Sequence, residues 1–159
     1  MRKSTRHKKI IGDFGESLVC NWMSRSGFEV SIVDHTGLDI IAYYPSTGER
    51  LGITVKARTR NPGTETRDVT IFKKGDRKKL SDACQAFGCT PWIAVYVETE
   101  DSGDIYLASL QNYDDRYRGR QVLTGSWKMD DKLRSRYQMD PHVRHVGIKF
   151  TPENWWSTD

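Results

Sequence analysis

Two charged side chains interrupt apolar stretches of the sequence in which strands are expected. Asp39 lies within LDIIAYY, and Lys56 lies within LGITVKA, with Thr54 two residues before it. Burying a carboxylate without a partner is costly, so an acid in such a strand needs a compensating group. If the two stretches form a hairpin, Asp39 and Lys56 lie on neighbouring strands and can be each other's charge partner. The hairpin would then hold a carboxylate and an ammonium group side by side.

A third charged residue, Glu16, falls at the border of an apolar arc on an expected helix. Each of the three charged residues also has a purely structural explanation. Asp13 and Glu16 have the spacing of a capping box, in which Glu16 reaches back to the helix N-terminus. Asp39 could be solvated at a strand end or cap the HTG turn, and Lys56 could be an exposed strand lysine. The residues alone leave these alternatives open.

The elements that must position these residues follow from the pattern of apolar residues and turn residues. A helix, three strands, a second helix and two further strands are expected in that order, and the turn YPSTGER makes the second and third strands an antiparallel hairpin. This order predicts an α/β fold with a mixed central sheet flanked by helices. The expected ranges are 13–26 and 76–88 for the helices, and 28–33, 38–44, 51–57, 91–98 and 104–110 for the strands.

Outside these elements the pattern is weaker. DVTIF (68–72) predicts a short additional strand, DDKLRSRYQM (130–139) a helix, and HVGIKF (145–150) a final strand. We expect a basic N-terminal arm over residues 1–11 and a single domain over 12–159. That domain has a core at about 12–110 and a C-terminal extension over 111–159. Trp155 and Trp156 in the tail are expected to pack against the core.

The composition limits the classes of function. The chain has 159 residues, of which 29% are charged, and a formal net charge of +4, which favours polyanionic partners. Its apolar runs are shorter than the roughly 18 residues that span a bilayer, so we expect no membrane association. Three cysteines do not suggest a disulfide framework, and the basic N-terminus lacks the apolar segment of a signal peptide. We therefore expect a reduced, cytoplasmic location.

Three short motifs together resemble the PD-(D/E)XK nuclease superfamily. They are GDFGE (12–16), GLDIIA (37–42) and GITVKAR (52–58), and the style is that of archaeal Holliday-junction resolvases and small restriction-endonuclease-like proteins. The resemblance covers about residues 12–97 and implies a restriction-endonuclease-like core. It implies that Asp39 is a metal ligand, Glu16 a further ligand and Lys56 the lysine that positions or activates the attacking water. The chain departs from the family at Thr54, which replaces the second acid of the motif.

The resemblance also implies a cofactor, Mg²⁺ or Mn²⁺. Its ligands would be Asp39, Glu16, the backbone carbonyl of Val55 and, weakly or through a water, Thr54. Because the threonine hydroxyl is neutral, we expect weaker Mg²⁺ binding than a second acid would give. Either the two acids suffice, or the nearby Asp34 or Asp68 takes the missing place, or the metal site is lost.

Basic residues supply the contacts that a DNA-binding protein needs, since such contacts go largely to phosphates. Tyr117, among arginines, could also stack on an unpaired base. The predicted nucleic-acid-binding residues are Lys8, Lys9, Arg58, Arg60, Arg67, Lys73, Lys74, Lys78 and Lys79.

The sequence thus supports three hypotheses of function. The first is a metal-dependent endonuclease that hydrolyses phosphodiester bonds in DNA, with branched or damaged DNA as candidate substrates. The second is a catalytically inactive nucleic-acid-binding module on the same fold, which Thr54 favours. The third is an unrelated α/β protein in which Glu16 caps a helix and Asp39 pairs with Lys56. A homodimer is a further expectation, since two DNA strands invite two-fold symmetry.

Overall fold

The computed structural model describes residues 3–120 and 124–151, and its central feature is a six-stranded sheet. The helices are α1 (His7–Arg25), α2 (Asp76–Phe87), α3 (Leu110–Arg116) and α4 (Asp131–Met139). The strands are β1 (Glu29–His35), β2 (Leu38–Tyr44), β3 (Glu49–Thr59), β4 (Val69–Phe72), β5 (Thr90–Glu98), β6 (Ser102–Ser109), β7 (Gly125–Trp127) and β8 (Val143–Lys149).

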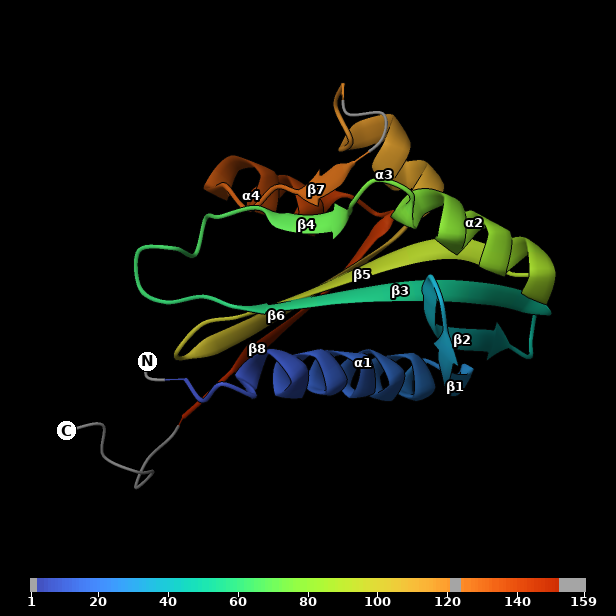
Figure 1. The fold of residues 1–159 in the computed structure, drawn as a ribbon, viewed down its shortest axis with the longest axis horizontal. Helices are drawn as coiled ribbons and strands as arrows, with labels where there is room; N and C mark the ends of the chain where they lie inside the picture. The colour runs from blue at the N-terminus through green and yellow to red at the C-terminus, as the bar shows by residue number, and fades with distance from the viewer. Residues whose placement is uncertain (1–2, 121–123, 152–159) are drawn as a thin grey trace.

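The central sheet is mixed, as the sequence predicts. Its order is β1-β2-β3-β5-β6-β8, and β3 pairs with β5 in parallel while its other neighbouring strands are antiparallel. Helix α1 lies against one face of the sheet, and α2, α3, α4 and the small β4–β7 sheet lie over the other (Figure 1). The predicted α/β architecture, with a mixed central sheet flanked by helices, is therefore confirmed.

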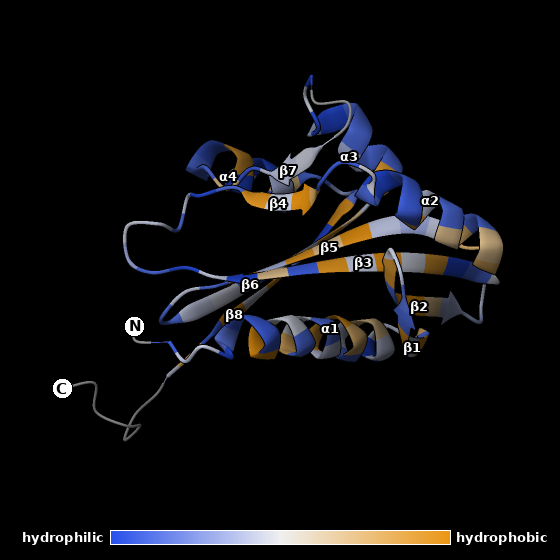
Figure 2. Cartoon of the chain, viewed as in Figure 1, coloured by the Kyte–Doolittle hydropathy of each residue, from blue (hydrophilic) through white to orange (hydrophobic). Residues whose placement is uncertain are grey.

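The two faces of the sheet carry two separate apolar clusters. The α1 face is packed with aliphatic side chains, among them Val19, Ile53 and Leu107. The opposite face is rich in aromatic side chains, with Trp127 stacked on Tyr137 at 4.3 Å between ring centroids. Figure 2 shows apolar residues in β4 and along the central strands, between helices that carry many hydrophilic residues. The site residues therefore belong to a sheet that is covered on both faces.

Helix α1 begins at His7, six residues before the expected start at Asp13. The residue before the helix, Arg6, makes no side-chain cap hydrogen bond, so the sequence carries no capping pattern at the true start. Asp13 and Glu16 both lie inside the helix, and the capping-box interpretation of Glu16 is wrong. Part of the expected basic arm, from His7 onward, is helical.

The segment after Leu110 is part of the fold. The expected helix and final strand are present as α4 and β8, and β8 extends the central sheet by pairing with β6. Helix α3 and strand β7 were not predicted. Tyr117 is only 8% exposed and donates a hydrogen bond to Asp140, so its expected stacking on a base is wrong. The division of the chain into arm, core and extension stays a prediction, and Trp155 and Trp156 lie outside the described residues.

No helix in the described part of the chain is both long and apolar enough to cross a bilayer.

Gly15 lets α1 approach the sheet closely. A Cβ atom built on Gly15 would lie 2.9 Å from the Cβ of Ala57 in β3 and 3.7 Å from that of Tyr96 in β5. Atoms of real side chains do not come so close, so any larger residue at this position must push α1 outward. Glu16 is the next residue, and the close contact therefore sets how far its carboxylate stands from β3.

We predict opposite effects for alanine at the two glycines of α1. Gly15→Ala introduces overpacking, which costs about 1–3 kcal/mol, against about 1 kcal/mol that alanine contributes as the better helix former. At Gly12 a Cβ atom meets nothing within 4 Å, so Gly12→Ala gains the helix propensity alone. Urea unfolding should therefore rank the variants Gly12→Ala, wild type, Gly15→Ala in decreasing stability. Equal stabilisation by both substitutions would show that α1 is not held close at Gly15.

Candidate active site

Asp39 binds the backbone of β3 at the point where the β2–β3 ladder stops. The last residue pair of that ladder is Ile40 with Ile53. One residue earlier in β2, the carboxylate oxygen Oδ2 of Asp39 accepts the backbone N–H of Val55 at 2.6 Å and the hydroxyl of Thr54 at 3.0 Å. The acid therefore satisfies a donor of β3 that no longer has a strand partner on that side. The carboxylate is part-buried and hydrogen-bonded rather than simply solvated.

Thr54 links Asp39 to Lys56. The ammonium group of Lys56 donates to Oγ1 of Thr54 at 3.2 Å, and the same hydroxyl donates to Asp39. Thr54 is 4% exposed, so this hydroxyl lies inside the protein and holds both charged groups at once. The expected pairing of Asp39 with Lys56 is therefore indirect, through the residue that stands where the family motif has an acid.

Glu16 is brought to the same place by α1. Partial burial raises the pKa of its carboxyl group, and the negative charges of Asp39 and Asp13 raise it further, whereas Lys56 and Lys9 lower it. Asp39 lies on β2 and Lys56 on β3, so charges from the sheet act on Glu16 of α1, although no hydrogen bond or ion pair joins Glu16 to either residue in the described part of the chain. The hydrogen bonds join Asp39, Thr54 and Lys56, and electrostatics adds Glu16.

The substitute acids considered from the sequence are not brought into this group. Asp68 forms an ion pair with Lys128 at 2.5 Å, and Asp34 is exposed near the end of β1. Neither contributes to the charges that shift Glu16. His35, the last residue of β1, packs edge-on against Phe87 with ring centroids 5.3 Å apart. The acids available to the site are thus Glu16 and Asp39.

The donor set suits a hard cation, although it is small. Among residues 3–120 and 124–151 there is no cluster of three or more His, Cys, Asp or Glu side chains that could hold a metal ion. Glu16 and Asp39 supply two carboxylates, and the Val55 carbonyl points to the same side as its N–H, toward Asp39. Mg²⁺ often binds through one or two carboxylates and keeps several waters. Burial is the main cause of the raised pKa of Glu16, and the negative charge of Asp39 is the second; a cation beside the two carboxylates would offset that second contribution.

Several predicted DNA-binding lysines form ion pairs within their own helices. These pairs are exposed, and exposed pairs contribute at most about 1 kcal/mol, so phosphates can displace the acidic partner. They are Lys9 with Asp13 at 3.0 Å, Lys78 with Asp82 at 2.6 Å and Lys79 with Asp76 at 3.6 Å. Five other predicted residues are exposed and form no ion pair within the described ranges: Lys8, Arg58, Arg67, Lys73 and Lys74.

Arg60 is used differently from the other predicted basic residues. Its Nη2 donates to the backbone carbonyls of Arg67 and Asp68 at 2.9 and 2.8 Å. Burial lowers its pKa, and the positive charges of Arg58 and Arg67 lower it further. The guanidinium therefore braces the loop that follows β3, and it positions Arg67 rather than extending from the surface.

A cavity of about 400 Å³ adjoins the end of β3 beyond Lys56. It is lined by Lys3, His7, Lys8, Ile11, Ala57, Arg58 and Thr59. Sequence analysis selected Lys8 and Arg58 but missed that Lys3 and His7 join them. The missing information was the start of α1 at His7, because an N-terminal arm over residues 1–11 gives these residues no defined place.

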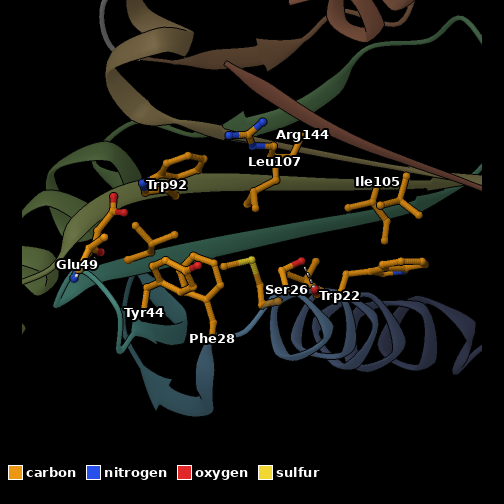
Figure 3. A pocket seen from close by; sticks show the side chains of 14 residues that line it. Trp22, Ser26, Phe28, Tyr44, Glu49, Trp92, Ile105, Leu107 and Arg144 are labelled. Atoms are coloured by element: carbon orange, nitrogen blue, oxygen red, sulfur yellow. Dashed lines mark hydrogen bonds between the residues drawn. The ribbon is translucent and has the colours of Figure 1, made fainter. Parts of the chain in front are cut away.

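A larger cavity of about 570 Å³ lies on the α1 face of the sheet (Figure 3). Figure 3 shows Trp22 from α1 and, from the facing strands, Tyr44, Trp92 and Leu107 among its lining residues. Its lining is mainly apolar, with Glu49 and Arg144 as the charged members. Such a surface offers few ligands for a cation or a phosphate, so the candidate chemistry is not located there.

Comparisons with known proteins support the fold. No family model matches the sequence, and no curated protein matches it. The structure is similar to that of Archaeoglobus fulgidus Hjc, described as a Holliday junction resolvase from an archaeal hyperthermophile. The TM-score is 0.55 and the sequence identity 16%, and the match covers 74% of this chain and 83% of that chain. At this identity the likeness shows the fold alone, which is the expected restriction-endonuclease-like α/β fold.

We predict that Glu16→Gln stabilises the protein near pH 7. A carboxyl group whose pKa is raised on folding contributes stability below its unfolded pKa of about 4.3, and this stability is lost as pH rises through the folded pKa. The glutamine removes that loss. Because Glu16 is partly exposed, solvent screening limits the effect to about 1 kcal/mol or less, or roughly 2–4 °C in Tm. Differential scanning calorimetry at pH 7 and pH 4 should show a higher Tm for the variant only at pH 7.

Asp13→Asn is the matched control for that measurement. Asp13 also raises the pKa of Glu16 but is exposed and forms a pair with Lys9 on the helix surface. Its substitution should therefore stabilise the protein less than Glu16→Gln does. A Tm for Glu16→Gln below that of wild type at pH 7 would contradict the electrostatic description of the site.

Proposed function

We propose that the protein is a metal-dependent endonuclease that hydrolyses phosphodiester bonds in DNA. The observation that supports this most is the hydrogen-bonded group of Asp39, Thr54 and Lys56, with Glu16 facing it from α1. The group lies on a fold similar to that of a protein described as a Holliday junction resolvase. Branched DNA is accordingly the first substrate to test, and damaged DNA the second. A homodimer and a cytoplasmic location remain predictions.

Glu16, Asp39 and the Val55 carbonyl would hold the cation, Mg²⁺ or Mn²⁺. When bound, the ion supplies positive charge that offsets the phosphate and makes water a better nucleophile. Thr54 is committed to Asp39 and Lys56 by its hydroxyl, so its part in metal binding is indirect. It fixes the orientation of the Asp39 carboxylate, whose other oxygen, Oδ1, has no hydrogen-bond partner among the described residues.

Lys56 would place its positively charged ammonium group next to the phosphate. Its ammonium group has three donors, and only one is occupied by Thr54 among the described residues. The remaining donors can contact a non-bridging phosphate oxygen and the attacking water. In this arrangement Lys56 stabilises the negative charge that develops during hydrolysis. Thr54 accepts a hydrogen bond from Lys56 and so determines where the ammonium group lies.

DNA would be held mainly by exposed cations around the site. Arg58 follows Lys56 on β3, Arg67 lies on the loop that Arg60 braces, and Lys73 and Lys74 precede α2. Lys8 and Lys9 extend this positive region along the start of α1, and Lys78 and Lys79 extend it along α2. Because such contacts read phosphates and not bases, they predict binding that is sensitive to salt and largely independent of sequence.

The second candidate function is nucleic-acid binding without cleavage. It is favoured by the neutral Thr54 and by the lack of a third ligand in the cluster of described residues. In this case Asp39 and Lys56 serve the structure through the Thr54 link, and the basic residues alone carry the function. Metal-dependent cleavage separates the two candidates.

We predict metal-dependent cleavage that requires both Asp39 and Lys56. Labelled linear duplex and four-way-junction DNA should be cut by wild type with Mg²⁺ or Mn²⁺. Asp39→Asn and Lys56→Ala should each reduce the rate by at least about a hundredfold, because one loses a ligand charge and the other loses the phosphate contact. The control is Lys132→Gln, an exposed lysine on α4, which should keep the wild-type rate.

Salt-sensitive DNA binding by wild type without any cleavage would reject the nuclease and support the second candidate. Equal cleavage by wild type and both site variants would trace the activity to a contaminant and remove the support for this site.

We predict that Thr54→Asp strengthens the response to metal and weakens the metal-free protein. The aspartate would place a second carboxylate beside Asp39, whose Oδ2 is 3.0 Å from the present hydroxyl. Two carboxylates so close repel each other unless a cation lies between them. Thermal unfolding with EDTA should give a lower Tm than wild type, and added Mn²⁺ should raise the Tm of the variant more than that of wild type. Thr54→Val is the control, because it loses the hydroxyl without adding charge and should show no increased response to Mn²⁺.

A further inference from the structure

The cavity beside Lys56 has an unusual balance of charge. Three of its lining residues, Lys3, Lys8 and Arg58, are basic, and none of the lining residues is acidic. All three residues are exposed, and Lys3 and Arg58 also donate to the backbone carbonyls of Thr59 and Ala57. A surface of this kind is selective for anions that can accept several positive charges at once.

The floor of the cavity is apolar and rigid. Ile11 of α1 and Ala57 of β3 are 7% and 6% exposed. The walls are tied together, because Nε2 of His7 and Oγ1 of Thr59 lie 2.7 Å apart and Lys3 donates to the Thr59 carbonyl at 3.4 Å. The cavity is therefore a formed part of the α1–β3 junction.

The nearest acid outside the cavity does not neutralise it. Oε1 of Glu98 lies 3.5 Å from Oγ1 of Thr59, while its Oε2 accepts the hydroxyl of Tyr96 at 3.0 Å. Glu98 belongs to β5 and is not among the lining residues. Its carboxylate accepts from both Thr59 and Tyr96, so one negative charge stands at the edge of the cavity against the three basic residues that line it.

We propose that this cavity binds the terminal phosphate of a nucleic-acid strand. A phosphate monoester carries a charge of about −1.5 to −2 at pH 7, whereas each internal phosphodiester carries −1. Three cations around one cavity match the dianion better than the monoanion. The guanidinium of Arg58 donates through Nη1 to the Ala57 carbonyl at 2.7 Å, and its remaining N–H groups can donate to phosphate oxygens.

The cavity adjoins the strand that carries Lys56. Arg58, one of its lining residues, follows Lys56 by two residues on β3, so their Cα atoms are about 6.6 Å apart and their side chains leave the same face of the strand. Ala57, which also lines the cavity, leaves the opposite face, so the cavity lies at the edge of β3 next to the candidate site and not within it. This inference rests on the proposed function for the identity of the strand as DNA, and it names strand ends, at nicks or free termini, as the preferred substrate class.

The test is binding measured without cleavage. Fluorescence anisotropy in EDTA compares three single-stranded oligonucleotides of one sequence, with a 5′-phosphate, a 3′-phosphate or hydroxyls at both ends. At low salt we expect about tenfold tighter binding of one phosphorylated strand than of the hydroxyl strand. The preference should fall to within twofold in the double variant Lys8→Gln/Arg58→Gln, and it should persist in the control Lys132→Gln.

Equal affinity of wild type for all three strands would overturn the inference, and so would a preference that survives in the double variant. Inorganic phosphate serves as a competitor. Displacement by inorganic phosphate at the same concentration as by the phosphorylated strand would identify free phosphate as the ligand and reject the strand end. Because no metal is present, these outcomes are independent of cleavage, and the proposed function fails separately if wild type does not cut DNA with Mg²⁺ or Mn²⁺.

Discussion

The double hydrogen bond to one oxygen of Asp39 is the interaction on which the site depends. It replaces a strand-to-strand contact beyond the last β2–β3 pair, and it fixes Thr54 so that the same hydroxyl can hold Lys56. An acid at position 54 would stand against Asp39, and the fold would then need a cation to offset the repulsion. The threonine makes the local structure complete without a metal. As a consequence, a divalent cation would bind this site more weakly than it would bind a site with two adjacent acids.

Two glycines allow the helices α1 and α2 to pack closely around the site. Gly15 allows α1 to lie against Ala57, which places Glu16 where Asp39 raises its pKa. Gly37, with φ of 93°, precedes β2 on the opposite face, where a Cβ atom would lie 2.6 Å from the backbone of Lys79 in α2. The turn that leads into Asp39 is thus packed against one helix, and the acid that faces it is carried by the other. The resulting proximity of two carboxylates lowers stability, which is common where a protein keeps charged groups for function.

The sequence was sufficient for the features that depend on local pattern. Period-two alternation and the YPSTGER turn predict the hairpin, and the register of β2 and β3 then brings Asp39 near Thr54 and Lys56. Features that depend on tertiary contacts were not accessible in this way. The start of α1 lacks a capping side chain, β7 has only three residues, and Tyr117 is buried by an aromatic cluster drawn from distant parts of the chain. The role of Thr54 as a link could not be predicted, because a pattern shows which face a hydroxyl occupies but not what it bonds.

The two candidate functions differ by one quantity, the affinity of Glu16 and Asp39 for a divalent cation. The basic residues that we propose to contact DNA come from α1, the end of β3 and α2, and their positions do not depend on the candidate metal site. In this proposal DNA binding would not require the metal, and its strength would be set by phosphate contacts and salt. Occupancy of the metal site is set separately by cation concentration relative to the dissociation constant. Under the proposed function, the protein would cut DNA when that constant lies below the available concentration of the cation, and under the second candidate function it would only bind DNA because the constant lies above. The neutral Thr54 lowers the affinity of the site for the cation, which favours binding without cleavage. Substrate phosphate would raise that affinity by adding oxygen ligands to the same ion, which favours cleavage.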